Sequence, residues 1–300
     1  MTQDFNNGAL HPDVPRQSEW DRLFYSPEAE RIKAEILEVG RKLWQRQYVD
    51  GNGGNVSFRI SENAVICTPT QICKGDMTAA DLCLVDMDGN QLAGGKSCTS
   101  EILMHLEIYK ATPEAKGVVH CHPPHATAYA ITRRVPPPCI IPEYEMLVGR
   151  MALAPYQTPG TREFAETVIP FAKTHNTILL ENHGIVAWAD TVTHAHWCVE
   201  VADTYCWTLM LAAGLGAPIA QIGPEKAPAL WAIRQRLGLP ESNGNGACKH
   251  CGGSDPLETI AVHPSTCGNE AAAPGEIDVE KIVRTVTQMV LAELAQAGKK

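Results

Sequence analysis

The chain has 300 residues, of which 44% are hydrophobic and 20% charged, so it can bury a sizeable core and has the composition of a folded globular protein. Its net charge of -9 disfavours nucleic acid as a partner, because a phosphate backbone requires a clustered positive surface. No apolar run reaches the roughly 20 residues of a membrane span and no apolar leader opens the chain, so we expect a cytoplasmic protein without a membrane partner.

Helices and strands are predicted to be mixed along the chain. Ser26 followed by Pro27 is typical of a helix start, and the apolar spacing continues this helix to Gln47. A glycine-rich loop at 51–55 leads into an alternating strand at 56–60. Further helices are predicted at 99–109, 123–132, 161–174 and 191–213, the last capped by Gly214, and further strands at 65–68, 82–87, 117–122, 177–181 and 185–188. This order indicates an α/β or α+β body.

Two histidines stand out on the strand predicted at 117–122. His120 and His122 are two residues apart, so both imidazoles lie on one face of that strand and can reach a single metal ion. His183, between two predicted strands and followed by a glycine, is the natural third ligand. Glu101, at the start of a predicted helix, is placed to complete the set. One histidine alone is more often an ordinary core or surface residue, but the joint pattern predicts a metal site.

Two other segments carry groups that bind anions. The glycine-rich loop 51–55 frees backbone N–H groups, and Asn55 adds a side-chain amide. Thr99 and Ser100 offer hydroxyls at the N-terminus of the helix that carries Glu101. A plain tight turn and an ordinary helix cap explain these segments equally well when each is taken alone. Together they predict a phosphate pocket beside the metal.

Five short motifs in this order resemble the class II aldolase/adducin family. They are Gly54-Asn55-Val56-Ser57, Thr68-Pro69-Thr70, Thr99-Ser100-Glu101, His120-Cys121-His122 and Asn182-His183-Gly184. The resemblance covers about residues 28 to 237. It implies a three-layer fold, in which helices flank a central, mostly antiparallel sheet, and a homotetramer with active sites between subunits.

The resemblance also implies a role for individual residues. His120, His122 and His183 would bind one Zn²⁺, with Glu101 as the catalytic carboxylate beside it. The substrate phosphate would be held by Gly54, Asn55, Thr70, Thr99 and Ser100. Family members also use a tyrosine as proton donor, for which Tyr144 is the candidate by location. Gln71 departs from the family pattern, which often has glycine there, and this puts the phosphate contact at that position in doubt.

The expected activity is therefore zinc-dependent cleavage of a deoxyketose 1-phosphate. L-fuculose or L-rhamnulose 1-phosphate would yield dihydroxyacetone phosphate and L-lactaldehyde, with the zinc stabilising the enediolate as a Lewis acid. The enzymatic alternative is an L-ribulose-5-phosphate 4-epimerase, which uses the same chemistry. A non-catalytic, adducin-like scaffold is the alternative of another class, and loss of the histidines would mark it; all three are present.

Composition changes after about residue 238. Residues 1–27 are expected to form an N-terminal extension, 28–237 the aldolase domain, 238–275 a flexible linker rich in glycine and proline, and 276–300 an amphipathic helix. Such a tail resembles the peptides that direct enzymes into bacterial microcompartments, so a shell protein is an expected partner. Folding back or pairing in an oligomer is the alternative. Cys248, Cys251, His263 and Cys267 offer a weak second zinc motif, a mobile reduced segment being the alternative.

Overall fold

One sheet of eight strands organises the chain in a computed structural model that describes residues 18–223 and 225–236. The strands are β1 (Asn55–Ser61), β2 (Ala64–Cys67), β3 (Cys83–Asp86), β4 (Gln91–Ala93), β5 (Gly117–Cys121), β6 (Ala152–Ala154), β7 (Thr177–Leu180) and β8 (Gly184–Ala189). Their spatial order is β4-β3-β2-β1-β5-β8-β7-β6. Every pair is antiparallel except β6 with β7. The central strands are β1, β5 and β8, which are far apart in the sequence.

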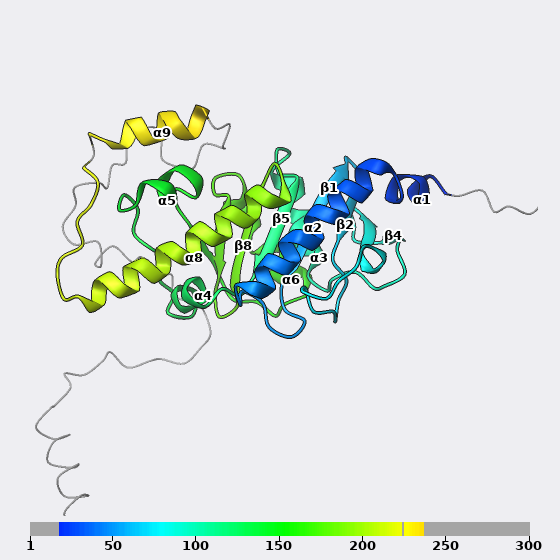
Figure 1. Ribbon diagram of the computed structural model, residues 1–300, viewed down its shortest axis with the longest axis horizontal. Helices are drawn as coiled ribbons and strands as arrows, with labels where there is room; N and C mark the ends of the chain where they lie inside the picture. Colours follow the sequence, from blue (N-terminus) through cyan, green and yellow to red (C-terminus); the bar gives the residue numbers. More distant parts are fainter. Residues whose placement is uncertain (1–17, 224, 237–300) are drawn as a thin grey trace, which may run out of the picture. The chain divides into compact units, whose positions relative to one another are not determined.

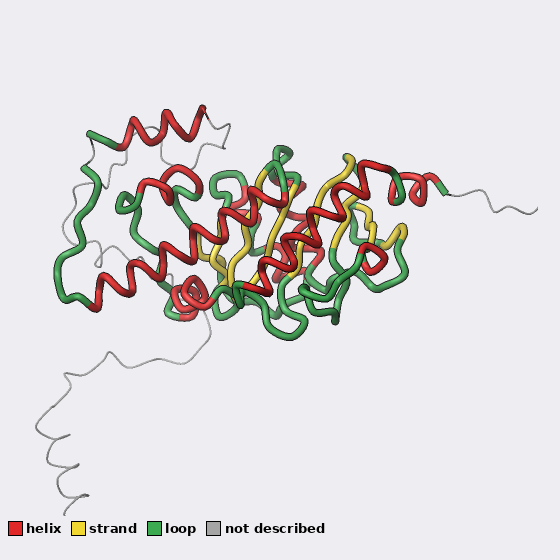
Figure 2. The backbone as a smooth tube through the Cα atoms, in the orientation of Figure 1, coloured by secondary structure: helices red, strands yellow, loops and turns green. Residues whose placement is uncertain are grey.

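Helices cover both faces of this sheet. They are α1 (Glu19–Phe24), α2 (Pro27–Gln45), α3 (Ile102–Ala111), α4 (Pro124–Ile131), α5 (Pro142–Leu147), α6 (Arg162–Glu166), α7 (Ile169–Ala172), α8 (Val192–Gly214) and α9 (Ala227–Arg236), with a 3-10 turn η1 (Ala79–Asp81). The long helices α2 and α8 run in front of the strands in Figure 1, and Figure 2 shows the same layers by type of element. The predicted three-layer, mostly antiparallel α/β fold is confirmed.

The alternation of side chains along the strands divides the core into two layers. Val56 and Phe58 of β1 pack with the buried face of α2 and α8. Val65 and Cys67 of β2 pack with the apolar side chains of α3 and α6 on the opposite face of the sheet. Because successive side chains of a strand point to opposite faces, the intervening residues of β1 face α3. That second face of β1 carries the polar residues of the site described below.

Local sequence signals explain most helix ends and the main errors of prediction. Ser26 accepts a hydrogen bond from the Ala29 N–H at 3.1 Å, so the predicted start of α2 is confirmed. The single helix predicted over 161–174 is wrong: α6 ends at Glu166 and α7 restarts with Pro170 in its first turn. Gly214 lies inside α8, and Gly216, with φ of +69°, takes the left-handed conformation instead. Helices α1, α5 and α9 and strands β4 and β6 were not predicted.

Some predictions fall partly or wholly outside the described residues. The linker at 238–275, the helix at 276–300 and the motif of Cys248, Cys251, His263 and Cys267 lie there and stay predictions. The range 1–27 is described from residue 18 onward, and within it α1 buries Phe24 in the core. Among the described residues, none of the helices combines the length and the apolar character that crossing a bilayer demands.

Candidate active site

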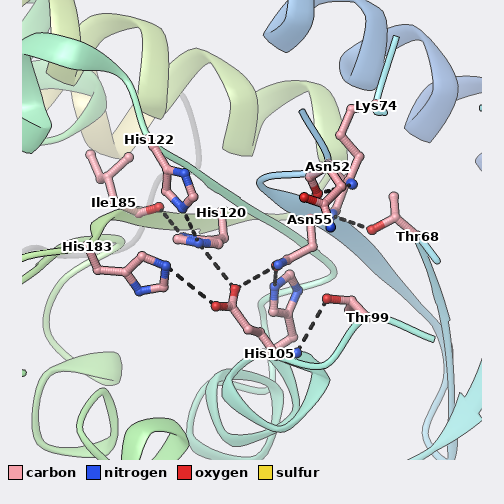
Figure 3. Close-up of polar contacts among 12 residues, drawn as sticks. Asn52, Asn55, Thr68, Lys74, Thr99, His105, His120, His122, His183 and Ile185 are labelled. Carbon is pink, nitrogen blue, oxygen red and sulfur yellow. Dashed lines mark hydrogen bonds and ion pairs between the residues drawn. The ribbon is translucent and has the colours of Figure 1, made fainter. Parts of the chain in front are cut away.

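Three imidazoles meet where β5 and β8 lie side by side. His120 belongs to β5, His122 follows its last residue, and His183 occupies the tight turn that joins β7 to β8. The ring centroids lie 4.7 to 5.0 Å apart, and one ligand nitrogen from each ring falls within 4.8 Å of the others. Figure 3 shows the three rings pointing toward one another. The structure brings together the histidines that the sequence singled out.

Glycines allow the backbone to approach these histidines closely. A Cβ at position 184 would lie 2.5 Å from the Cys121 carbonyl oxygen and 2.7 Å from the His122 ring, so β8 can pack on β5 here only with glycine. Asn182, with φ of +54°, supplies the left-handed residue of the turn before His183. The Asn-His-Gly sequence therefore presents His183 to the other two rings.

The electrostatic environment favours neutral imidazoles. Burial, followed by the proximity of His122 and His183, lowers the pKa of His120 well below its ordinary value, and burial lowers the pKa of His122 to about 4. His120 Nδ1 lies 2.9 Å from the Ile185 carbonyl oxygen, which can only accept, so Nδ1 carries the proton and Nε2 keeps its lone pair. That Nε2 atom lies 3.1 Å from His122 Nε2. A neutral imidazole oriented through its other nitrogen is the form that binds a metal.

Glu101 completes the cluster from the opposite side. It occupies the position before the first residue of α3, and its Oε2 lies 3.2 Å from His120 Nε2. Its Oε1 lies 3.5 Å from His183 Nε2. The side chains of His183 and Glu101 keep exposed fractions of 13% and 11%, so small molecules have access to this end of the cluster. The predicted proximity of Glu101 to the three histidines is confirmed.

This donor set fits a divalent transition metal. Three imidazole nitrogens and one carboxylate are ligands that zinc accepts. Among the described residues, His183 Nδ1 is a buried polar atom without a hydrogen-bond partner. The same cluster without a metal would bring three desolvated imidazoles together for no gain in stability.

The glycine-rich loop packs directly on β5, the strand that carries His120. Gly54 has φ of +69°, and a Cβ there would lie 2.5 Å from Val49 Cγ1 and 2.9 Å from the His120 carbonyl oxygen. Asn55 pairs with His120 across β1 and β5. Its Nδ2 donates to Glu101 Oε2 at 2.8 Å, and its Oδ1 lies 2.5 Å from His105 Nε2. The Asn55 amide therefore connects the carboxylate of Glu101 to the imidazole of His105.

The hydroxyl-bearing segments lie in two neighbouring loops. The Thr99 N–H donates to the Thr68 carbonyl at 3.1 Å, and the Thr70 N–H donates to the Ser97 carbonyl at 3.0 Å. Ser100 lies against Gly160, where an added Cβ would be 3.3 Å from the Ser100 carbonyl oxygen. Gln71 has φ of +57°, so the departure from the family pattern leaves a left-handed backbone of the kind that glycine favours. Thr99 and Ser100 thus lie next to Glu101, and Thr70 lies in the neighbouring loop that pairs with the segment before them.

A buried lysine ties these loops to the glycine-rich loop. Lys74 is 1% exposed, and its Nζ donates to the carbonyl oxygens of Asn52 at 2.9 Å and Ile72 at 2.8 Å. Figure 3 shows the Lys74 side chain extending toward Asn52. Burial is the main cause that lowers the pKa of Lys74 to about 8. The sequence analysis did not single out this residue, because one lysine in a loop gives no signal.

Lys74→Met is expected to change the pH dependence of stability. The unfolded chain keeps the lysine proton up to its ordinary pKa of 10.5, whereas the folded chain releases it near 8. The wild type should therefore gain unfolding free energy relative to Lys74→Met as pH rises from 8 to 10.5, by up to about 3 kcal/mol, since one pKa unit is worth about 1.4 kcal/mol. Urea unfolding of both proteins at several pH values measures this difference. A difference that is constant with pH would contradict the lowered pKa.

Tyr144 lies in the core. It is 0% exposed and stacks on Tyr205 with ring centroids 3.8 Å apart. Burial raises the pKa of Tyr144 well above its ordinary value. Within the described residues, its hydroxyl has no hydrogen-bond partner. In the single chain this hydroxyl is enclosed, and the proton-donor role of Tyr144 stays a prediction.

Comparison with known proteins gives the same picture from sequence and structure. The family described as Class II Aldolase and Adducin N-terminal domain matches residues 34–210. A 3-oxo-tetronate 4-phosphate decarboxylase of Haemophilus influenzae is 37% identical over 155 residues, which are 50% of this chain and 73% of that protein. An L-fuculose phosphate aldolase of Methanococcus maripaludis is also 37% identical, over 170 residues, which are 56% of this chain and 91% of that protein.

A solved structure shares the fold as well. An L-fuculose 1-phosphate aldolase superposes with a TM-score of 0.63 at 26% identity, covering 70% of this chain and 97% of that one. The family match at residues 34–210 includes His120, His122, His183 and Glu101.

Proposed function

The chain belongs to the class II aldolase and adducin family and is a metal-dependent lyase, and we propose that it is a zinc-dependent aldolase acting on a deoxyketose 1-phosphate. The substrates would be L-fuculose or L-rhamnulose 1-phosphate, and the products dihydroxyacetone phosphate and L-lactaldehyde. The observation that carries the proposal is the cluster of His120, His122 and His183 around the carboxylate of Glu101.

The histidines and the carboxylate of the cluster have different roles in the proposed cleavage. His120, His122 and His183 hold the zinc ion, which when bound supplies Lewis-acid stabilisation for negative charge on the substrate oxygens. The C3–C4 bond breaks as the C4 hydroxyl gives its proton to the carboxylate of Glu101, and C4 becomes the aldehyde carbon. The electron pair of the bond remains with the phosphorylated fragment as an enediolate. Glu101 then delivers a proton to C3, and dihydroxyacetone phosphate results.

We propose that the phosphate of the substrate lies in the two loops beside Glu101. The groups that bind it are Gly54, Asn55, Thr70, Thr99 and Ser100. Support comes from the hydrogen bonds that bring Thr68 next to Thr99 and Thr70 next to Ser97, and from the N-terminus of α3 directly behind Ser100. Lys74, fixed between Asn52 and Ile72, adds positive charge behind these loops. Holding the phosphate there places C3 and C4 over the cluster.

A second candidate substrate is 3-oxo-tetronate 4-phosphate, because a relative with that decarboxylase activity in its name is 37% identical. Loss of carbon dioxide from this acid also leaves the enediolate of dihydroxyacetone phosphate, and Glu101 would protonate it in the same way. The two reactions differ in the fragment that leaves. Aldol cleavage requires a base for the C4 hydroxyl proton, whereas decarboxylation requires none. The cluster of zinc ligands and Glu101 serves both reactions.

A substrate panel tests the proposal. Purified protein is offered L-fuculose 1-phosphate, L-rhamnulose 1-phosphate, 3-oxo-tetronate 4-phosphate and L-ribulose 5-phosphate, and dihydroxyacetone phosphate is measured with a coupled reductase. We expect release from a deoxyketose phosphate that stops after chelation and returns with Zn²⁺. Release from the tetronate alone would assign the decarboxylase. Epimerised pentulose phosphate without release would assign the epimerase, and silence of zinc-loaded protein on all four would contradict the lyase substrates proposed.

We also propose the homotetramer and the microcompartment location. Several large apolar side chains of α8 are exposed in the single chain, which supports contact with another copy: Trp197, Trp207, Met210 and Leu211. The shell-binding role of residues 276–300 is based on the sequence pattern alone, because these residues lie outside the described ones.

A further inference from the structure

A ladder of buried polar side chains joins α3 to β1 behind the metal cluster. On α3 and its first flanking residue, Glu101, His105 and Tyr109 recur every four residues and lie on one face of the helix. On β1, Asn55 and Ser57 lie two residues apart on the face turned toward α3. Four residues of helix rise about 6 Å and two residues of strand about 6.6 Å, so the two series stay in register.

Short contacts connect these five side chains into one series of hydrogen bonds. Asn55 Nδ2 donates to Glu101 Oε2 at 2.8 Å, and Asn55 Oδ1 lies 2.5 Å from His105 Nε2. His105 Nδ1 lies 2.7 Å from Ser57 Oγ, which lies 2.8 Å from the Tyr109 hydroxyl. Figure 3 shows His105 below Asn55, apart from the three histidines at the left of the view.

The donors and acceptors that each side chain offers fix the direction of these hydrogen bonds. His105 is 0% exposed, and burial lowers its pKa to about 3, so the ring is neutral and has one N–H and one lone pair. Since Asn55 turns its NH₂ group to the carboxylate, its oxygen faces His105 and must accept. His105 Nε2 therefore carries the hydrogen, and Nδ1 accepts from the Ser57 hydroxyl. The Tyr109 hydroxyl has one hydrogen to donate. Its two acceptors are Ser57 Oγ, at 2.8 Å, and the Lys116 carbonyl oxygen, at 3.0 Å.

We propose that His105 is a positioning residue of the reaction, which acts through Asn55 to hold Oε2 of Glu101 in one place. The inference rests on the proposed function only for its kinetic consequence. His105 itself is enclosed and touches no substrate. When the N–H of His105 is removed, nothing fixes which end of the Asn55 amide faces Glu101. The Glu101 carboxylate then loses its fixed hydrogen-bond donor. A displacement of about 1 Å at a reacting group can cost roughly 100-fold in rate.

Two amide substitutions separate positioning from simple burial. In His105→Gln, the side-chain amide nitrogen can take the place of Nε2 and donate to Asn55. In His105→Asn, the shorter amide can take the place of Nδ1 and contact Ser57, but it cannot reach Asn55. We expect His105→Asn to lower kcat by about 10- to 100-fold with KM nearly unchanged, and His105→Gln to restore most of kcat. The zinc content of both variants should equal that of the wild type.

A control variant and a double-mutant cycle make the kinetic test specific to the contact between His105 and Asn55. His196→Asn removes another buried histidine, on α8, and should leave kcat unchanged. The double variant Asn55→Ala/His105→Asn should be no slower than Asn55→Ala, because His105 acts only through Asn55. Equal losses of kcat in His105→Gln and His105→Asn, additive losses in the double variant, or loss of zinc would each overturn the proposal. Where His105→Asn does not fold, Ser57→Ala, which removes the Nδ1 donor, takes its place with a smaller expected loss.

A spectroscopic measurement does not depend on any substrate. Side-chain ¹⁵N–¹H correlation spectra of the zinc-loaded wild type report which nitrogen of a neutral histidine carries hydrogen. We expect His105, assigned by its absence in His105→Gln, to show hydrogen on Nε2. Hydrogen on Nδ1 would overturn the proposal even if the aldolase assignment holds. Conversely, hydrogen on Nε2 in a protein that cleaves no substrate of the panel would reject the proposed function while the ladder stands.

Discussion

Glu101→Gln is expected to bind zinc as the wild type does and to lose about 10³-fold in kcat. The substitution keeps the size of the side chain and an oxygen that can take the place of Oε2, next to His120 and the Asn55 amide, so we expect the three imidazoles to keep their arrangement. An amide cannot accept or deliver the proton that C3 exchanges, and proton transfer by a positioned side chain is worth about 10² to 10⁴ in rate. Single-turnover release of dihydroxyacetone phosphate and metal analysis of the same sample measure both effects.

Glu107→Gln is the matched control for Glu101→Gln. Glu107 lies on the same helix and pairs with Lys110 at 3.0 Å near the surface, so its substitution should leave kcat unchanged. Turnover by Glu101→Gln within about tenfold of the wild type would remove Glu101 as the proton carrier. If Glu101→Gln loses zinc together with activity, the main role of Glu101 is to bind the metal and not to carry the proton.

His120→Asn should abolish tight zinc binding while the sheet stays intact. Asn can place its amide nitrogen near the position of Nδ1 and donate to the Ile185 carbonyl, which His120 does at 2.9 Å. It has no atom at the position of Nε2, the atom 3.1 Å from His122 and 3.2 Å from Glu101. We expect zinc affinity to fall by more than the roughly 100-fold that loss of an outer hydrogen-bond partner costs, and activity to fall with it.

Zinc affinity is read by competition with a chromogenic chelator, and stability by thermal unfolding with and without the metal. The wild type should show a rise in midpoint with zinc that His120→Asn lacks. His194→Asn, which changes an exposed histidine paired with Asp190, controls for adventitious binding and should behave as the wild type. Stoichiometric, tightly held zinc in His120→Asn would exclude His120 as a ligand.

The sequence predicts those parts of the site that are marked by local spacing. His120 and His122 share one face because a strand alternates, and the Asn-His-Gly turn has the residues that a tight hairpin requires. The meeting of His183 with the other two rings depends on the pairing of β5 with β8, for which spacing gives no evidence. The family resemblance supplied that step. The three-layer fold followed from the same resemblance.

Other parts of the site could not be predicted because their signal is distributed over two elements. His105 in an apolar helix and Ser57 in an alternating strand each resemble an isolated polar residue. Their hydrogen bond to each other forms only when α3 packs on β1 in one register. Tyr144 shows the opposite case, since it was chosen by its place along the chain, and only packing reveals its stacking on Tyr205. A signal was present in Glu101, His105 and Tyr109, whose four-residue period marks a polar stripe.

The order of the strands has a kinetic consequence. The three imidazoles come from the end of β5 and from the turn before β8, and the side chains that contact Glu101 and His105 come from β1 and α3, so segments separated by more than a hundred residues must meet before the cluster forms. Contacts between such distant segments form slowly, because the entropy of closing the loop is lost before the contact stabilises the chain. A partly assembled chain therefore has no high-affinity place for the ion. Bound zinc would then slow the unfolding of the folded protein without accelerating its folding.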